Sequence, residues 1–321
     1  MSTSVETRPA AGGGNPKQRK PRLSDRARSE RRLGLWLAGP AFVIMLAVTA
    51  YPILLAFYDS LFKYRLTAPD DRSFVFFGNY ITVLTDTVFW RDLGVTLLIT
   101  VVTVVIELVL GFILAMIMNS ALKSIRGWLR TAILVPYGII TVVSAFAWFY
   151  AFDINSGYVN SWFDWVPGIS PDLNWFANFG TSISVIMASE IWKTTPFISL
   201  LLLAGLAQVP GELTEAAEVD GATWWQRFSR VIVPNMKAAI MVAVLFRALD
   251  AFRIFDNVYI MTKGAYGTET LSLLAYRTSI TRLEIGMGSA ISVLLFLCVI
   301  IICFIAIKLF KVDLTGARGG N

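Results

Sequence analysis

The chain has 321 residues, of which 56% are hydrophobic and only 16% are charged, and its net charge is +6. This composition is too apolar for an ordinary soluble domain. The sequence contains no histidine, which excludes histidine-based acid–base catalysis, Ser-His-Asp triads and most catalytic zinc sites. It also lacks a P-loop motif, so we expect no enzymatic activity, no cofactor and no metal site in this chain.

The chain begins with a basic tail, residues 1–32, which holds nine Lys or Arg residues and three acidic residues. Such a tail could bind nucleic acid, or it could be a disordered segment beside a membrane that helps to set the topology. We favour the second interpretation, without a nucleic-acid partner, because a long apolar run follows the tail directly.

Six apolar stretches follow, each long enough to cross a lipid bilayer as a helix, which takes roughly 20 residues. They are continuous rather than alternating, which excludes a transmembrane β-barrel. The sequence therefore predicts an all-α integral membrane protein, with a six-helix transmembrane domain at residues 33–313 and a cytoplasmic tail at residues 314–321. The stretches are Leu33–Phe62, Leu93–Met118, Trp128–Phe152, Ile183–Gln208, Ala238–Met261 and Gly286–Phe310.

The distribution of Lys and Arg predicts the orientation in the plasma (inner) membrane. Basic residues flank the second and fourth connections and both ends of the chain, whereas residues 131–192 contain none. By the positive-inside rule, both termini and the segment 209–234 are cytoplasmic. The aromatic segment 153–180 then lies outside, where it anchors at the headgroups, forms an interfacial helix or receives an external partner. Four basic residues in the first outer loop weaken this asymmetry without reversing it.

Ionisable residues inside the predicted spans are costly, so each either lines a polar pathway or is paired within the protein. Glu107 lies near the middle of the second stretch, and both alternatives are open for it. Glu190 and Lys193 in the fourth stretch are three residues apart, so we expect that they can pair along one helical face.

In the fifth stretch, a charged residue recurs at every third position. On a helix these side chains form a stripe along one side, and their alternating signs let them pair with one another. The stripe is either a self-neutralised scaffold or one wall of a water-filled route, and we favour the route. The candidate lining residues of this route are Glu190, Asp250, Asn257 and Tyr259. The surrounding charge network consists of Glu107, Lys193, Arg247, Arg253 and Asp256.

Between the fourth and fifth stretches lies a patterned segment, Val209–Pro234, that is too polar to enter the membrane. Pro210 stands where a helix can begin, and Glu212 places a negative charge near the positive end of that helix. Gly221 predicts the end of the helix, because glycine takes left-handed dihedral angles without steric cost.

A second short helix is predicted directly afterwards. Thr223 and Gln226 have the spacing of a capping box at its start, and Pro234 closes it. Trp224 and Phe228 are four residues apart, so this helix has an apolar face. Two amphipathic helices on a membrane surface need another surface to cover that face, and a second protein is a good candidate.

The segment resembles the cytoplasmic loop of permease subunits of bacterial ABC importers. The pattern of that family is Glu-Ala-Ala, three residues, Gly, nine residues, and Ile-x-Leu-Pro. The matching residues are Glu215, Ala216, Ala217, Gly221 and Pro234, while Val231 and Val233 replace the Ile and the Leu. The segments Ile191–Phe197, Asp220–Ala222 and Phe255–Thr262 narrow the resemblance to the maltose-type sugar permeases. More narrowly, the sequence as a whole is similar to the trehalose importer permeases of mycobacteria.

The resemblance implies a heteromeric complex in the lipid bilayer. Its other members would be a second homologous permease, two ATPase subunits that bind ATP and Mg, and an extracytoplasmic sugar-binding lipoprotein. This chain would form half of the pathway for a sugar, such as the disaccharide trehalose. The resemblance also implies that the loop couples to one ATPase subunit, through Glu212, Glu215, Ala216, Ala217, Asp220, Gly221, Phe228 and Pro234.

Two other functions fit the residues considered alone. One is a self-sufficient, proton-linked carrier that uses Glu107, Glu190 and Asp250 as relay groups. The other is a membrane scaffold that recruits a cytoplasmic partner through the polar loop without transporting anything.

Overall fold

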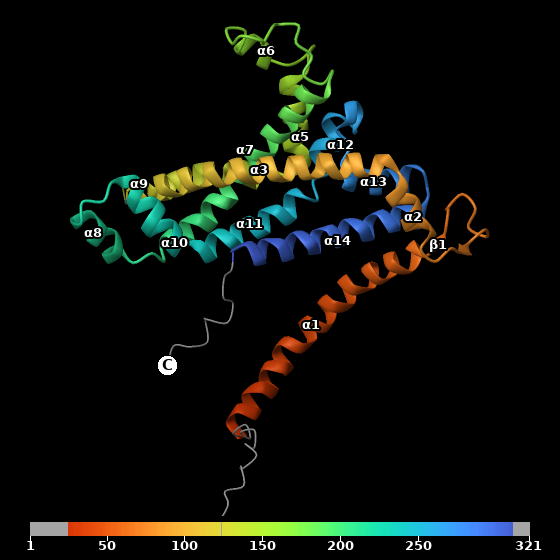
Figure 1. Cartoon of the computed structure of the whole chain (residues 1–321), viewed down its shortest axis with the longest axis horizontal. Coiled ribbons are helices and arrows are strands. Elements are labelled where there is room, and N and C mark those ends of the chain that lie inside the picture. The colour runs from red at the N-terminus through yellow and green to blue at the C-terminus, as the bar shows by residue number, and fades with distance from the viewer. Residues whose placement is uncertain (1–24, 123, 311–321) are drawn as a thin grey trace, which may run out of the picture. The chain divides into compact units, whose positions relative to one another are not determined.

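The structure is a computed structural model that describes residues 25–122 and 124–310, and helices dominate it (Figure 1). The chain divides after Leu54 into two units, and α1 contains all of the described part of the first. The helices are α1 (Asp25–Ser60), α2 (Gly78–Thr85), α3 (Thr87–Ser120), α4 (Arg126–Gly138), α5 (Thr141–Phe152), α6 (Val159–Trp162), α7 (Phe179–Leu206), α8 (Gly211–Val219), α9 (Trp224–Arg227), α10 (Val233–Asn235), α11 (Lys237–Ala251), α12 (Asp256–Met261), α13 (Leu271–Tyr276) and α14 (Ile285–Phe310).

Short elements of other kinds connect these helices. The strands β1 (Phe62–Lys63) and β2 (Ser73–Phe74) form an antiparallel pair in which Phe62 lies opposite Phe74. Two π-helical turns, η1 (Phe228–Ile232) and η3 (Arg277–Thr281), and one 3₁₀ turn, η2 (Ala265–Gly267), continue or join the later helices.

The helix α1 begins at Asp25, so residues 25–32, which were predicted to belong to a disordered tail, are helical instead. Arg, Ala and Glu dominate these residues, and all three are good helix formers. The remaining parts of the predicted tails, residues 1–24 and 314–321, lie outside the described residues.

Four helices of the described chain are long and apolar enough to cross a membrane: Arg32–Ser60 within α1, α3, α7 and Ile285–Lys308 within α14. The helices α4 and α5 meet this test together as one span that is bent by 85°. The predicted fifth stretch is not one helix, because α11 ends at Ala251 and α12 starts only at Asp256. Helix length and hydropathy therefore support four spans, or five with the bent pair.

The two breaks have different causes. Pro136 precedes the break between α4 and α5, and proline removes a backbone donor and clashes with the preceding turn. The break at Phe252–Phe255 contains neither proline nor glycine. There the carbonyl of Ile254 accepts a bond from the Thr270 hydroxyl at 3.2 Å, so a side chain from a distant segment satisfies a backbone group that the helix has released.

The helix α3 packs along α7, and α11 lies between α3 and α14 (Figure 1). A Cβ atom on Gly111 of α3 would lie 2.7 Å from Cγ2 of Ile198 on α7, so glycine permits the close approach of these helices. Two buried apolar clusters form along them, one around Ile99 and Ile186 and one around Phe112 and Ile198. Between the members of these two clusters, the sequence of α3 places Glu107 and that of α7 places Glu190, Lys193 and Thr194.

Candidate functional site

A single buried guanidinium joins three long helices. Arg247 on α11 is 1% exposed, and its Nε and Nη2 donate to the two carboxylate oxygens of Glu107 on α3, at 2.5 and 3.0 Å. The same Nη2 donates to Glu190 on α7 at 2.8 Å, and Nη1 donates to Asp250 at 2.7 Å. One cation thus binds three carboxylates, and the planar fork of arginine suits this geometry.

Two neutral side chains complete the group. The Thr194 hydroxyl donates to Oε1 of Glu107 at 2.8 Å, and Nδ2 of Asn257 on α12 donates to Oε2 of Glu190 at 2.6 Å. A buried charge is tolerated when it is paired and its remaining hydrogen-bonding positions are filled, and the Glu107–Arg247 pair meets both conditions. Two roles were open for Glu107 from the sequence, lining a polar pathway or pairing within the protein, and in the structure it is paired within the protein.

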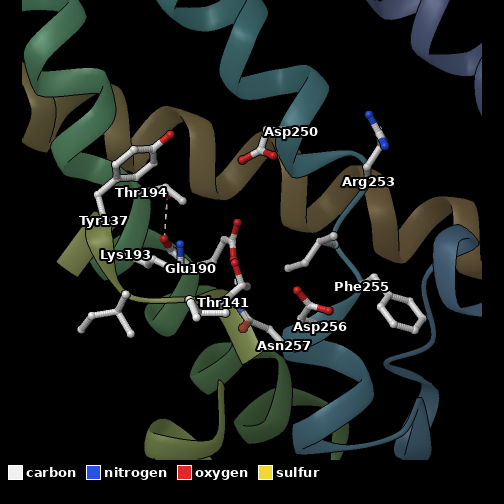
Figure 2. Close-up of a pocket in the computed structure, with 13 residues that line it drawn as sticks. Tyr137, Thr141, Glu190, Lys193, Thr194, Asp250, Arg253, Phe255, Asp256 and Asn257 are labelled. Atoms are coloured by element: carbon white, nitrogen blue, oxygen red, sulfur yellow. Dashed lines mark hydrogen bonds between the residues drawn. The ribbon is translucent and has the colours of Figure 1, made fainter. Parts of the chain in front are cut away.

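A cavity of about 520 Å³ opens beside this group (Figure 2). Its volume falls within the range of about 300–1,000 Å³ that is usual for small-molecule sites. Three of the four candidate lining residues, Glu190, Asp250 and Asn257, lie on its wall. Other lining residues that bear on its chemistry are Tyr137, Thr141, Lys193, Thr194, Arg253 and Asp256.

Both helix breaks lie at the cavity. Its lining includes Ile139–Thr141, where α4 meets α5, and Arg253–Phe255, where α11 meets α12. Inside a membrane, non-helical backbone is tolerated only where it is buried in protein or lines a wet cavity. Broken helices around a polar cavity at membrane depth are also the usual construction of substrate sites in transport proteins. The backbone and the side chains therefore point to the same place.

The predicted pair of Glu190 and Lys193 is wrong. Glu190 binds Arg247 and Asn257, whereas Nζ of Lys193 lies 5.5 Å from the centre of the Tyr137 ring, on α4. Nη2 of Arg247 reaches Glu190 while its other nitrogens bind Glu107 and Asp250, so the packing of the three helices places the guanidinium, rather than Lys193, at this carboxylate.

Mutual pairing along the predicted stripe of charges is limited to its first two members, whereas Asp250, Arg253 and Asp256 all lie on the cavity lining, as expected for a stripe that faces a route. Arg247 and Asp250 are paired, but no ion pair joins Arg253 or Asp256 to another described residue. The reason is the end of α11 at Ala251, after which the backbone no longer keeps a helical face. Tyr259 stacks on Phe255 at 5.3 Å between ring centres, and the cavity lining does not include it.

The polar loop between α7 and α11 has the two predicted helices. Gly221 follows α8 with φ of +75°, and the N–H groups of Gly221 and Ala222 donate to the carbonyls of Glu218 and Ala217. These two bonds form a Schellman motif, which ends a helix at glycine. The Thr223 side chain accepts from the N–H of Gln226, and the Gln226 side chain accepts from the N–H of Thr223, so the capping box is present.

Pro234 does not close the second helix. It lies in the first turn of α10, where its missing N–H group costs nothing, and the chain continues through Met236 into α11. The π-helical turn η1 before it changes the register of the backbone bonds, as the Val233 N–H donates to the Phe228 carbonyl. The structure places Glu212, Glu215, Ala216 and Ala217 in α8, Asp220 as its cap, Phe228 at the start of η1 and Pro234 in α10.

The loop presents aromatic side chains to its surroundings. Trp224 and Trp225 are 54% and 64% exposed, and no residue of α8, α9 or α10 is buried. Phe228 connects the loop to the rest of the fold, because its ring stacks on Trp224 and contacts Phe112 of α3 at 5.5 Å. An ion pair between Glu218 and Arg227, which sequence reasoning missed, joins α8 to α9.

Known proteins share this sequence and fold. The model of the family described as "Binding-protein-dependent transport system inner membrane component" matches residues 107–312. The chain belongs to this family. It is 49% identical over 293 residues to the trehalose transport system permease protein SugA of Mycobacterium tuberculosis, which covers 91% of this chain and 92% of that protein. It is 36% identical over 281 residues to the trehalose/maltose transport system permease protein MalF of Thermococcus litoralis, covering 87% and 94% of the two chains.

The fold has a relative of known structure. A bacterial ABC transporter involved in the import of the acidic polysaccharide alginate contains a chain that superposes with a TM-score of 0.75 at 19% identity, covering 91% of this chain and 100% of that one. The likeness confirms the predicted ABC permease fold. The chain is thus an inner-membrane permease component of a binding-protein-dependent transport system, from a family of transport proteins rather than enzymes.

Sequence reasoning missed several parts of the permease site. Tyr137 and Thr141 line the cavity, and neither carries a charge that would have drawn attention. Pro136 and Gly138 indicate the break on which Tyr137 and Thr141 lie, so that signal was present in the sequence. The bond from Thr194 to Glu107 links residues 87 positions apart and leaves no local trace in the sequence.

Proposed function

We propose that this permease forms half of the import pathway for a sugar, and that the cavity beside Arg247 is where the sugar passes. The observation that carries the proposal is a polar cavity bounded by two broken helices and backed by a buried, fully paired arginine. The trehalose and trehalose/maltose permeases to which the chain is similar support a disaccharide such as trehalose as the cargo.

The chemistry of the cavity suits a sugar. Sugar hydroxyls need hydrogen-bond acceptors, and Glu190 and Asp250 provide carboxylate oxygens on one wall, where Asn257 holds Glu190 through Nδ2. Tyr259 has no part in this wall, so the proposal keeps three of the four candidates.

Alanine substitutions test this assignment. We expect Asp250→Ala and Asn257→Ala each to raise the KM for uptake of labelled trehalose in cells that carry the complete importer, because the first removes an acceptor and the second removes the bond that holds Glu190. Glu284→Ala, at the outer end beside Arg65, removes a carboxylate far from the cavity and serves as the control. Unchanged uptake kinetics in both cavity variants would contradict the assignment.

The proposal includes a heteromeric assembly. The other members are a second homologous permease, two ATPase subunits that bind ATP and Mg, and an extracytoplasmic sugar-binding lipoprotein. We count six spans by taking α4 with α5, and α11 with α12, as one broken span each. Both termini and the loop 209–234 are cytoplasmic, as the distribution of Lys and Arg indicates.

The loop is the coupling element. Its small residues Ala216 and Ala217 allow a close approach, and Glu215 offers a charge-assisted hydrogen bond to an ATPase subunit. Because α8 to α10 lie between α7 and α11, movement of the loop would be transmitted to two helices that line the cavity. The exposed rings of Trp224 and Trp225 fit a surface that a partner covers.

Two substitutions test the coupling role. We expect Glu215→Lys and Gly221→Pro to abolish sugar uptake while the protein still inserts into the membrane, and normal uptake with either one would contradict the role.

Purified protein alone in liposomes separates the proposal from a proton-linked carrier. Gradient-driven accumulation of trehalose without any ATPase subunit would overturn the importer assignment.

A further inference from the structure

The wall of the cavity next to Arg247 consists of hydrogen-bond acceptors with free positions. Asp250 uses only Oδ2, which binds Arg247, and its side chain is 72% exposed. Its Oδ1 has no hydrogen-bond partner among the described residues. Asp256, also on the wall, makes no hydrogen bond or ion pair through its carboxylate within the described chain. A ligand that faces this wall therefore meets oxygen atoms that need donors.

Asn257 adds an unpaired acceptor that is buried. The residue is 1% exposed and lines the cavity, and its Oδ1 has no partner. Nδ2 donates to Glu190, so the amide cannot turn over without bringing Oδ1 against a carboxylate. Buried polar atoms without partners are rare because they lose their bonds to water and gain none in return. Neighbouring atoms cover Oδ1, so a ligand in the cavity does not contact it, and Asn257 contributes to the wall by holding Glu190 through Nδ2.

Arg247 sets the position of this wall. Its Nη1 holds Asp250 and its Nη2 holds Glu190. The guanidinium is itself fixed by Glu107, which accepts a hydrogen bond from Nε. Arg247 does not itself line the cavity, so a ligand meets the carboxylates rather than the cation.

The two cations on the cavity lining do not cover the wall. Lys193 lies over the ring of Tyr137 and forms no ion pair with a described carboxylate. Figure 2 shows the side chain of Arg253 at the edge of the cavity, directed away from Glu190 and Asn257. An anionic group on a ligand that faced the wall would therefore be placed among Glu190, Asp250 and Asp256.

We propose that Arg247 is a positioning residue, and that the acceptor wall it holds makes the permease itself select uncharged, hydroxylated saccharides and reject acidic ones. The inference rests on the proposed function, because it needs the sugar to enter this cavity. A hydroxyl can donate to Asp250 Oδ1 and to the carboxylate of Asp256. A sugar carboxylate has no proton to donate at neutral pH and adds a like charge beside carboxylates, which disfavours binding.

Equilibrium dialysis tests the proposal with the native complex, purified in detergent and freed of its external binding protein. The probes are labelled trehalose and the mono-uronic acid derived from it. We expect the wild type to bind trehalose at least about tenfold more tightly than the acid, as a like-charge contact predicts. In Asp250→Asn and Glu190→Gln the ratio should fall to about threefold or less, because each change removes one charge and adds a donor. Glu284→Gln, which removes a carboxylate at the outer end, should keep the wild-type ratio.

Arg247→Lys tests the positioning role separately. Lysine keeps the charge but cannot hold three carboxylates at once, so we expect trehalose to bind about tenfold more weakly without any gain for the acid. Wild-type affinity in a folded Arg247→Lys complex would exclude the positioning role. If the Glu190→Gln complex does not assemble, Asp250→Asn alone still tests the selectivity. The side chain of Asp250 is exposed, and the substitution alters only its one ion pair with Arg247.

The outcomes separate the two proposals. Equal binding of the two saccharides by the wild type, or an unchanged ratio in Asp250→Asn, overturns the selectivity inference and leaves the sugar site in place. Failure of the wild type to bind either saccharide at millimolar concentration overturns the sugar site and the inference with it.

Discussion

The Arg247 group and the loop 209–234 are stabilised in opposite ways. Arg247 is buried and draws two of its three carboxylate partners from residues 57 and 140 positions away, so the group is complete only when the helices are packed. The loop is held by bonds between residues that are close in sequence, such as the capping box at Thr223, and none of its helical residues is buried. The charges of the Arg247 group are paired within this chain. The loop, by contrast, takes its conformation from short-range hydrogen bonds and leaves its surface uncovered.

This difference predicts separate consequences for substitutions. Changes to the Arg247 group should alter the stability of the whole protein as well as transport. Changes to the loop should alter transport while global stability is nearly unchanged.

The largest effect is expected for Arg247→Met. It leaves Glu107 buried without its cation, and breaking a buried ion pair in this way costs about 3–5 kcal/mol. We expect a clear fall in the unfolding temperature of the purified protein, measured by the fluorescence of its tryptophans. The double variant Arg247→Met with Glu107→Gln should recover part of the loss, because no unpaired charge remains. An unchanged unfolding temperature in Arg247→Met would mean that water already solvates this group.

A smaller effect is expected for Gly221→Val. The φ of +75° at this position disfavours any residue with a Cβ atom, by about 1–2 kcal/mol, although nothing lies within 4 Å of a Cβ placed there. The cost is thus one of backbone conformation only. We expect trehalose uptake to fall severalfold with the unfolding temperature nearly unchanged. Gly221→Asn is the matched control, because asparagine tolerates left-handed dihedral angles, and it should retain most of the uptake. An equal loss of uptake in both variants would show that the added side chain, and not the backbone conformation, causes the loss.

Thr223→Ala should have a weaker effect. It removes the oxygen that caps α9, a loss of about 1 kcal/mol. We expect faster amide hydrogen exchange at Gln226 and Arg227 and little change elsewhere. Thr223→Ser keeps the hydroxyl and should exchange at the wild-type rate. Faster exchange that extended into α11 would contradict the view that the loop is locally stabilised.

The smallest effect concerns the segment that follows α5. Three hydrogen bonds lower the pKa of Asp153 below its ordinary value, first the bond from the Ser156 N–H, then those from the Ser156 hydroxyl and the Asn155 N–H. A lowered carboxyl pKa stabilises the turn at pH values above the unfolded-state pKa, and the contribution disappears as the pH falls through the folded-state pKa. The Ser156 amide should therefore stay protected from pH 7 to 5, whereas Asp153→Asn should show no change in protection at lower pH. Loss of protection already at pH 6 in the wild type would contradict the shift.

The sequence predicted those parts of the structure that depend on local or repetitive patterns. The long apolar runs identified α3, α7 and α14, because a single helix that crosses a bilayer needs roughly 20 mostly apolar residues in a row. Gly221 and Thr223 identified the ends of the loop helices, because caps act over three or four residues.

The rest depends on contacts that have no local pattern. The break after Ala251 occurs without proline or glycine and is stabilised by Thr270, from a later segment. Glu190 had a lysine three residues away, yet it binds Arg247, because the geometry of packed helices decides which donor reaches it. The charges of the site could thus be identified from the sequence, but their partners could not.

Cysteine labelling at Thr141 tests most directly whether the cavity is the sugar pathway. Thr141 lines the cavity and forms no side-chain hydrogen bond within the described chain, so Thr141→Cys should disturb the site little. The native Cys298 and Cys303 are first replaced by serine, and Thr82→Cys, an exposed position outside the cavity lining, serves as the control. In the native complex we predict that a small hydrophilic thiol reagent labels both cysteines, and that trehalose slows labelling only at position 141. No labelling at position 141, or labelling that trehalose leaves unchanged, would contradict the account.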